Sequence, residues 1–97
     1  MARYIILCKF THQCITNVKE SPKRLDVAKA AFKAMGAELK EFYLTMGRYD
    51  MVVLADAPND EVVGKLALAI AAQGNISTET IRAFSEDEYR KMIAALP

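Results

Sequence analysis

Apolar residues fall into four short runs that are typical of β-strands. The first run, residues 3–10, is rich in Ile, Tyr and Phe, which predicts a strand that is buried on both faces. Residues 39–46 and 51–57 form two further runs on either side of a glycine-containing turn, and a more polar run spans residues 76–84. The pattern therefore predicts a central hairpin with one strand on each side of it along the chain.

Between the first strand and the hairpin, apolar residues recur at helical spacing. Ser21 and Pro22 suit the N-cap and the first position of a helix over residues 22–35. Gly36 suits the position just after the end of that helix. Residues 11–20, which come before it, are expected to form a mixed loop with room for one helical turn.

Two more helices follow the hairpin. Asn59 is expected to cap the first of them, which has two acidic residues in its first turn and ends at Gly74. The sequence Ser85-Glu86-Asp87-Glu88 has the S-x-x-E form of a capping box, and it predicts the start of a short last helix.

The order β-α-β-β-α-β with a terminal helix predicts an α+β fold of the ferredoxin-like class, as a single domain over residues 1–97. In this arrangement a four-stranded antiparallel sheet has its first and third strands in the centre and its second and fourth strands at the edges. Both main helices cover the same face of the sheet. The other face is bare unless another molecule covers it.

The register of the hairpin follows from its turn. Gly47 at the first position of a two-residue turn suits a type II′ turn, because that position requires a positive φ. With this turn, Leu44 lies opposite Met51 and Tyr43 lies opposite Val52, and directly opposed residues point to the same face. A slip of one residue would exchange the two faces.

This register divides the hairpin into two faces of different composition. The face that is expected to lie under the helices carries Phe42, Leu44, Met46, Tyr49, Met51, Val53 and Ala55. The opposite face carries Leu39, Glu41, Tyr43, Thr45, Asp50, Val52, Leu54 and Asp56. The second set is too apolar for a sheet face in water, so it predicts a second subunit and thus a homodimer or a higher even oligomer.

Two candidate sites follow from the expected strand directions, in which the fourth strand runs antiparallel to the third. The first groups Tyr4, Tyr49, Asp50 and Arg82 at one end of the sheet, where Arg82 could hold an anion and Tyr49 or Asp50 could move a proton. The alternative for these residues is a structural Asp50–Arg82 pair, with Asp50 also bonding turn amides. The second site groups Phe10, Thr11, His12, Cys14, Glu41 and Asp56 at the other end.

His12 is the one histidine of the chain, and it is a candidate general base or ligand contact. The alternative is an exposed loop histidine. Its spacing from Cys8 and Cys14 matches no closed zinc pattern and leaves a fourth ligand missing, so no metal site is expected. Tyr43, together with Phe10 and Thr11, completes the set of candidate ligand-binding residues.

The composition narrows the classes of partner. The chain has 13 basic and 12 acidic residues, and this balance argues against nucleic-acid binding. No apolar run reaches the length that crosses a membrane, and the first apolar run is too short for a secretory signal. The two cysteines do not make a disulfide framework, which favours the cytoplasm. No glycine-rich nucleotide motif is present, so no cofactor is expected.

The chain resembles the GYD domain family over nearly its whole length. The motifs that carry this resemblance are Lys9-Phe10-Thr11, Ser21-Pro22 with Arg24, Phe42-Tyr43 with Thr45-Met46-Gly47 and Tyr49-Asp50, Ala57-Pro58 with Asp60-Glu61, Gly74-Asn75, and Thr78-Glu79-Thr80 with Arg82-Ala83-Phe84. The resemblance implies a dimeric α/β barrel, in which two sheets face each other. The family often has glycine where this chain has Cys14, which argues against catalysis by that thiol.

Two functions of different class compete at this point. One is a small homo-oligomeric protein that binds a small, partly apolar or anionic ligand. The other is a cofactor-free enzyme, of the monooxygenase or isomerase type, on the same scaffold, and it rests on analogy of fold. A pure assembly or regulatory module is a third interpretation.

Overall fold

The computed structural model describes residues 1–97, and its elements follow the predicted order. They are β1 (Ala2–Phe10), α1 (His12–Thr16), a 3₁₀ turn (Val18–Glu20), α2 (Ser21–Ala34), β2 (Glu38–Leu44), β3 (Met51–Ala57), α3 (Asp60–Ala71), β4 (Ile76–Ala83) and α4 (Glu86–Ala94). The β-α-β-β-α-β pattern is therefore confirmed, and α1 is the helical turn expected in the first loop.

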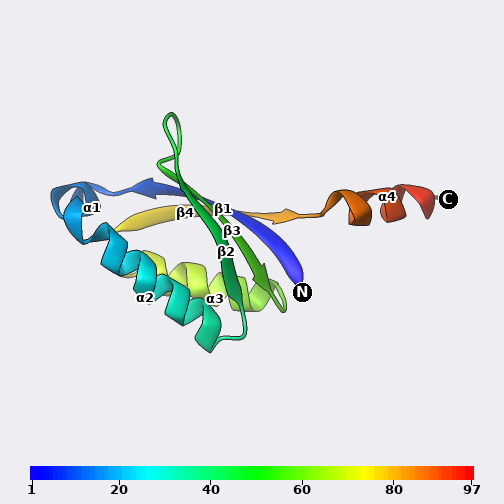
Figure 1. Cartoon of the computed structure of the whole chain (residues 1–97), viewed down its shortest axis with the longest axis horizontal. Helices are drawn as coiled ribbons and strands as arrows, with labels where there is room; N and C mark the ends of the chain where they lie inside the picture. Colours follow the sequence, from blue (N-terminus) through cyan, green and yellow to red (C-terminus); the bar gives the residue numbers. More distant parts are fainter.

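The four strands form one antiparallel sheet in the order β2-β3-β1-β4 (Figure 1). Strands β1 and β3 are central, and β2 and β4 are the edges, as the ferredoxin-like arrangement requires. Helices α2 and α3 cover one face, which we call the helix-covered face. The other face carries no element of this chain, and we call it the open face.

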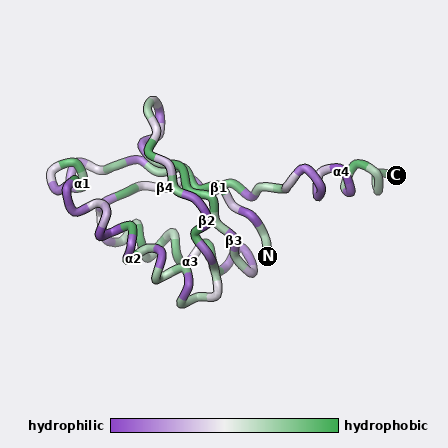
Figure 2. Tube along the Cα trace, viewed as in Figure 1, coloured by the Kyte–Doolittle hydropathy of each residue, from purple (hydrophilic) through white to green (hydrophobic).

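The core lies between the sheet and the two helices. Every second residue of β1 and β3 is buried there, which is the period of two that a strand with one covered face predicts. Figure 2 shows that the middle of the sheet is largely apolar. The buried cluster contains Tyr4, Ile6, Cys8, Phe32, Ala37, Met51, Val53, Ala55, Ala57, Val63 and Leu66.

Local capping explains where the helices begin and end. Gly36 has a φ of +77°, and the amide of Ala37 donates to the carbonyl of Phe32 at 2.9 Å, which completes a Schellman motif at the end of α2. The expected N-cap at Ser21 is wrong, because the 3₁₀ turn leads directly into α2 and makes Glu20 the cap. The caps at Asn59 and Ser85 are confirmed, and Ser85 forms the full capping box.

The hairpin keeps the predicted register although its turn is wider than predicted. Leu44 lies opposite Met51 and Tyr43 lies opposite Val52. The amide of Thr45 donates to the carbonyl of Asp50 at 2.8 Å, so a four-residue connection, Met46–Tyr49, replaces the two-residue turn. Gly47 within it has a φ of +122°, which favours glycine.

Several of the predicted face assignments need correction in β2 and the connection. A bulge shifts the register between Leu39 and Glu41, so Leu39 lies opposite Ala55 on the helix-covered face rather than on the open face. Leu44 and Met46 do not lie under the helices. They are 72% and 99% exposed, because the hairpin extends past the helices that cover the rest of the sheet.

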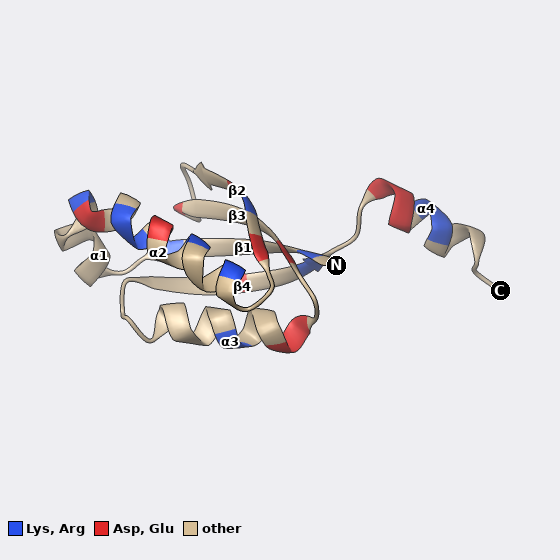
Figure 3. Cartoon of the chain, turned by 60° about the horizontal axis from the view of Figure 1, so that its bottom comes forward, with Lys and Arg blue, Asp and Glu red and all other residues tan.

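Helix α4 projects away from the body of the molecule (Figures 1 and 3). It contributes to the overall extents of 52 × 31 × 18 Å, which are elongated for a chain of this length. All of its residues are exposed, including the apolar Tyr89, Met92 and Ile93. An apolar stripe without a partner within its own chain therefore extends from the end of β4.

Candidate functional site

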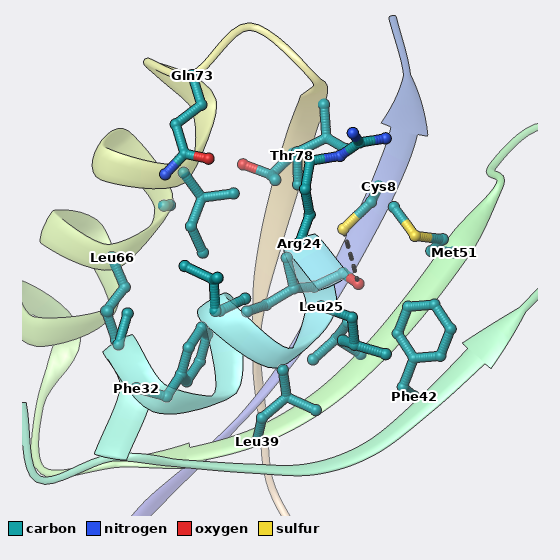
Figure 4. Close-up of a pocket in the computed structure, with 18 of the residues that line it drawn as sticks. Cys8, Arg24, Leu25, Phe32, Leu39, Phe42, Met51, Leu66, Gln73 and Thr78 are labelled. Atoms are coloured by element: carbon teal, nitrogen blue, oxygen red, sulfur yellow. Dashed lines mark hydrogen bonds between the residues drawn. The ribbon is translucent and has the colours of Figure 1, made fainter. Parts of the chain in front are cut away.

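A cavity of about 260 Å³ lies between the helix-covered face of the sheet and helices α2 and α3 (Figure 4). Seventeen of its 22 lining residues are hydrophobic, so it is an apolar chamber rather than a polar cleft. Its floor includes Ile6, Cys8, Met51 and Val53 from β1 and β3. Exposed residues, among them Val27, border it and lead to solvent.

Small side chains explain why this space is left open. Helix α2 turns Ala28 and Ala31 toward the cavity, and α3 contributes Ala67 and Ala69. Where one helix packs on a sheet, larger residues such as Leu and Phe normally fill this distance. Here Phe32 and Leu66 fill only part of the layer.

The polar side chains that line the cavity are few. They are Arg24 and Ser21 from α2, Gln73 after α3 and Thr78 from β4. Figure 4 shows Arg24, Gln73 and Thr78 toward one end of the chamber, whereas Leu39, Phe32 and Phe42 lie toward the other end. No Asp or Glu lines the cavity, so Arg24 is its charged residue.

Arg24 makes two hydrogen bonds within the chain, and both use the same nitrogen. Its Nη2 donates to Sγ of Cys14 at 3.3 Å and to the carbonyl of Asn17 at 3.1 Å. These bonds connect α2 to the segment that follows β1. The Nε and Nη1 groups of Arg24 have no acceptor within the chain and remain available.

Both cysteines line the cavity as free thiols. Cys14 is 1% exposed and Cys8 is 3% exposed. Burial raises the pKa of Cys8 to about 11, which keeps this thiol protonated at neutral pH. Cys8 is therefore a small hydrophobic side chain in the floor of the cavity rather than a nucleophile.

The structure does not bring the four residues of the first predicted site together. Strands β3 and β4 are both antiparallel to β1, so they run in the same direction, whereas the prediction had them running in opposite directions. Asp50 therefore lies near Phe10, and its carboxylate accepts the amide of Phe10 at 2.8 Å. Arg82 lies opposite Tyr4, at the far end of the sheet. The predicted Asp50–Arg82 pair is wrong for this reason.

Tyr4 and Arg82 do lie together, although not around an open site. The hydroxyl of the buried Tyr4 donates to the Asp60 carboxylate in the first turn of α3. Burial, followed by this bond, raises the pKa of Tyr4. The Arg82 guanidinium lies 5.6 Å from the Tyr4 ring and 4.3 Å from the Phe84 ring, which are cation–π distances.

Tyr49 lies in a polar cluster at the other end of the sheet, on the open face rather than under the helices as predicted. Its hydroxyl donates to the Glu79 carboxylate at 2.6 Å, and Lys9 Nζ lies 5.6 Å from its ring. The bond to Glu79 raises the pKa of Tyr49. Tyr43 makes a similar bond to Glu41 on β2, which raises its pKa as well.

The residues of the second predicted site are also dispersed. Phe10 packs against the core, and Thr11 caps α1 and donates its hydroxyl to the carbonyl of Gly74 at 2.6 Å. His12 is exposed at the start of α1 and does not line the cavity. Asp56 pairs with Arg3 at 2.5 Å, at the opposite end of the sheet from Phe10.

None of the predicted catalytic or ligand-binding residues lines the cavity. The one sequence feature that could have pointed to the cavity is Arg24 at the start of α2, because the alanines that line it are also expected from helix propensity alone. No group of three or more His, Cys, Asp or Glu side chains lies in an arrangement that could hold a metal ion. None of the helices has both the length and the apolar character needed to cross a membrane.

The open face has an apolar centre between two polar ends. Ile5 of β1 lies opposite Leu54 and Ile81, and Leu7 lies opposite Val52 and Glu79. The Arg3–Asp56 pair lies at one end, and the Lys9, Tyr49 and Glu79 cluster lies at the other. A shallow depression next to Arg3 reaches the base of α4 at Ser85 and Glu88.

Two solved structures share this architecture. The crystal structure of FFRP-DM1 matches with a TM-score of 0.60 and 22% sequence identity, over 87% of this chain and all of that chain. TTHA0845 from Thermus thermophilus matches with a TM-score of 0.56 and 21% identity, over 88% of this chain and 95% of that chain. At these identities the matches show the fold alone, which is the ferredoxin-like α+β arrangement described above.

No curated protein has a sequence that matches this chain. The model of the GYD domain family matches residues 4–93, which is nearly the whole length. This match agrees with the motifs that surround Gly47, Tyr49 and Asp50. The chain therefore belongs to the GYD domain family.

Proposed function

We propose that this protein is a homo-oligomeric binding protein that holds a small, mostly apolar molecule in the cavity between α2, α3 and the sheet. The observation that carries the proposal is the cavity itself, about 260 Å³ with predominantly hydrophobic walls. An empty apolar cavity lowers stability, because the groups that line it lose packing contacts. A ligand that fills the chamber restores those contacts and stabilises the fold.

The volume sets the size of the ligand. Pockets for drug-sized molecules measure about 300–1,000 Å³, so a smaller molecule is expected here. An apolar cavity of about 150 Å³ takes up benzene, which has six non-hydrogen atoms. By proportion, this chamber of about 260 Å³ suits a molecule of roughly ten non-hydrogen atoms.

The proposed assembly rests on surfaces that this chain leaves uncovered. Ile5, Leu7, Val52 and Leu54 form an apolar centre on the open face, with polar groups at both ends. An apolar centre with a polar rim is the anatomy of a protein interface. The exposed apolar residues of α4 add a second uncovered surface. A second copy facing the sheet would bury the first surface, in keeping with the fold class.

The alternative function, a cofactor-free enzyme, gains no support from a specific group at the cavity. The raised pKa of Cys8 makes this thiol a poor nucleophile. Tyr49 and His12 do not line the chamber, and the pKa of Tyr49 is raised rather than lowered toward neutrality. The binding role therefore remains the proposal.

A cavity-filling variant tests the binding role. Ala28 faces the chamber, whereas Ala30 on the same helix is exposed and does not line it, so Ala30→Leu is a matched control for Ala28→Leu. We expect 1-octanol, a neutral probe of suitable size, to raise the melting temperature of the wild type and of Ala30→Leu, but not of Ala28→Leu. An equal shift in all three proteins, or no shift in any, would contradict binding in this cavity.

A further inference from the structure

The charge of the cavity is unbalanced. Arg24 is partly buried and lines an apolar chamber to which no acidic side chain contributes. Its hydrogen-bond partners are a thiol and a backbone carbonyl, both of them neutral. By contrast Arg3, which is also partly shielded, is paired with the Asp56 carboxylate. A cation that loses solvent without a counter-ion is costly, so an anion at this position would be favoured.

Arg24 also has the geometry to bind an anion. Only Nη2 is used within the chain, so Nε and Nη1 are free to donate. The planar guanidinium matches a carboxylate with two parallel hydrogen bonds, and such charge-assisted bonds are roughly twice as strong as neutral ones. One guanidinium balances one negative charge, which suits a monoanion.

Two neutral polar side chains lie at the same end of the cavity as Arg24. They are the amide of Gln73 and the hydroxyl of Thr78, and neither side chain has a hydrogen-bond partner within the chain (Figure 4). Both can donate to an anion. The other end of the chamber is purely apolar, with Leu39 and Phe42. The chamber thus has one polar end and one apolar end, and it matches an amphiphile.

We propose that the ligand of this cavity is a small monocarboxylate with an apolar body, such as a medium-chain alkanoate or an arylacetate, and that Arg24 binds its carboxylate. The size estimate of roughly ten non-hydrogen atoms fits both examples. This inference rests on the proposed binding function, and it adds the chemical class of the ligand and the residue that recognises it.

Octanoate and 1-octanol test the inference as a matched pair, because they share the alkyl chain and differ in the charged group. Calorimetric titration of the wild type is expected to show that octanoate binds at least about tenfold more tightly than 1-octanol. In Arg24→Met, the affinity for octanoate should fall to that for 1-octanol, while the affinity for 1-octanol is unchanged. Lys29→Met, on the exposed side of the same helix, is the control and should bind both probes as the wild type does.

The outcomes separate this inference from the proposed function. If both probes bind equally to the wild type, or if Arg24→Met keeps the preference for octanoate, the inference is wrong and the binding function stands. If neither probe binds, the binding function fails and the inference fails with it.

Arg24 also connects α2 to Cys14 and Asn17, so its removal can affect folding. If Arg24→Met does not fold, Arg24→Lys decides the question, because lysine keeps the charge but not the planar fork. A several-fold loss of affinity for octanoate in Arg24→Lys, with unchanged affinity for 1-octanol, supports the inference. Unchanged binding of both probes overturns it.

Discussion

The two faces of the sheet are built from alternate residues of the same strands, yet they present opposite surfaces. On the helix-covered face, Ile6 is 6% exposed and borders the apolar chamber. On the open face, the neighbouring Ile5 lies in a broad apolar strip that nothing in this chain covers. The period of two along β1 thus separates a surface that suits a small molecule from a surface that suits another protein chain.

The polar groups reinforce this contrast. On the open face, Arg3 and Asp56 form an ion pair, and the hydroxyl of Tyr49 donates to the carboxylate of Glu79. In the chamber, Arg24 lacks such a partner. Paired charges at the edge of a surface are typical of an interface rim, whereas an unpaired cation in an apolar chamber is typical of a ligand site.

The change with the largest expected effect is Val52→Glu in the centre of the open face. If a second copy covers this face, the substitution buries an uncompensated carboxylate in each subunit, at a cost of at least about 3 kcal/mol per dimer. We expect light scattering after size exclusion to show a monomer. The matched control, Lys29→Glu on the outer side of α2, should keep the wild-type mass. An unchanged mass for Val52→Glu would contradict the face assignment.

A pair of adjacent isoleucines gives the next largest effect. Ile6→Ala removes a buried side chain and should lower the free energy of unfolding by about 2–5 kcal/mol, independently of protein concentration. Ile5→Ala should lower the free energy of unfolding by less. This loss should grow with protein concentration, because Ile5 stabilises the protein through the interface between copies. Urea denaturation of both variants at two protein concentrations measures this. Equal, concentration-independent costs would contradict the contrast between the faces.

The smallest effect is the pH dependence of the Arg3–Asp56 pair. The hydrogen bond from Arg3 holds the pKa of Asp56 below its usual value. A depressed folded-state pKa gives stability that is present above the unfolded pKa, about 4, and that is lost as the pH falls through the folded value. Asp56→Asn should therefore lose less stability than the wild type between pH 7 and pH 3, as measured by urea denaturation. Parallel losses would show that this pair contributes nothing.

Much of the fold could be predicted from local signals. The short apolar runs of the strands, the glycine after α2 and the capping residues Asn59 and Ser85 each act over a few residues, so they can be recognised in the sequence. The predicted pairing of Leu44 with Met51 is also confirmed, because the two-residue turn and the observed four-residue connection place these residues opposite each other.

The errors in the site prediction arose from longer-range geometry. The predicted grouping of Asp50 with Arg82 depended on the relative direction of β3 and β4. These strands are not neighbours in the sheet, and each takes its direction from its pairing with β1. Leu39 changed face because of a bulge that no residue type signals. The cavity was missed because alanines such as Ala28 and Ala31 are common in helices for their propensity alone, so they do not reveal an unfilled space.

Native mass spectrometry of gently purified protein reports subunit number and bound molecules together, so one experiment examines both the assembly and the cavity. We expect an even oligomer in which each subunit carries an organic acid of roughly ten non-hydrogen atoms. Val52→Glu should lose the assembly, and Ala28→Leu should lose the bound mass while it keeps the assembly. A monomeric wild type that carries no organic molecule and takes up no added octanoate would contradict both the proposed assembly and the proposed ligand binding.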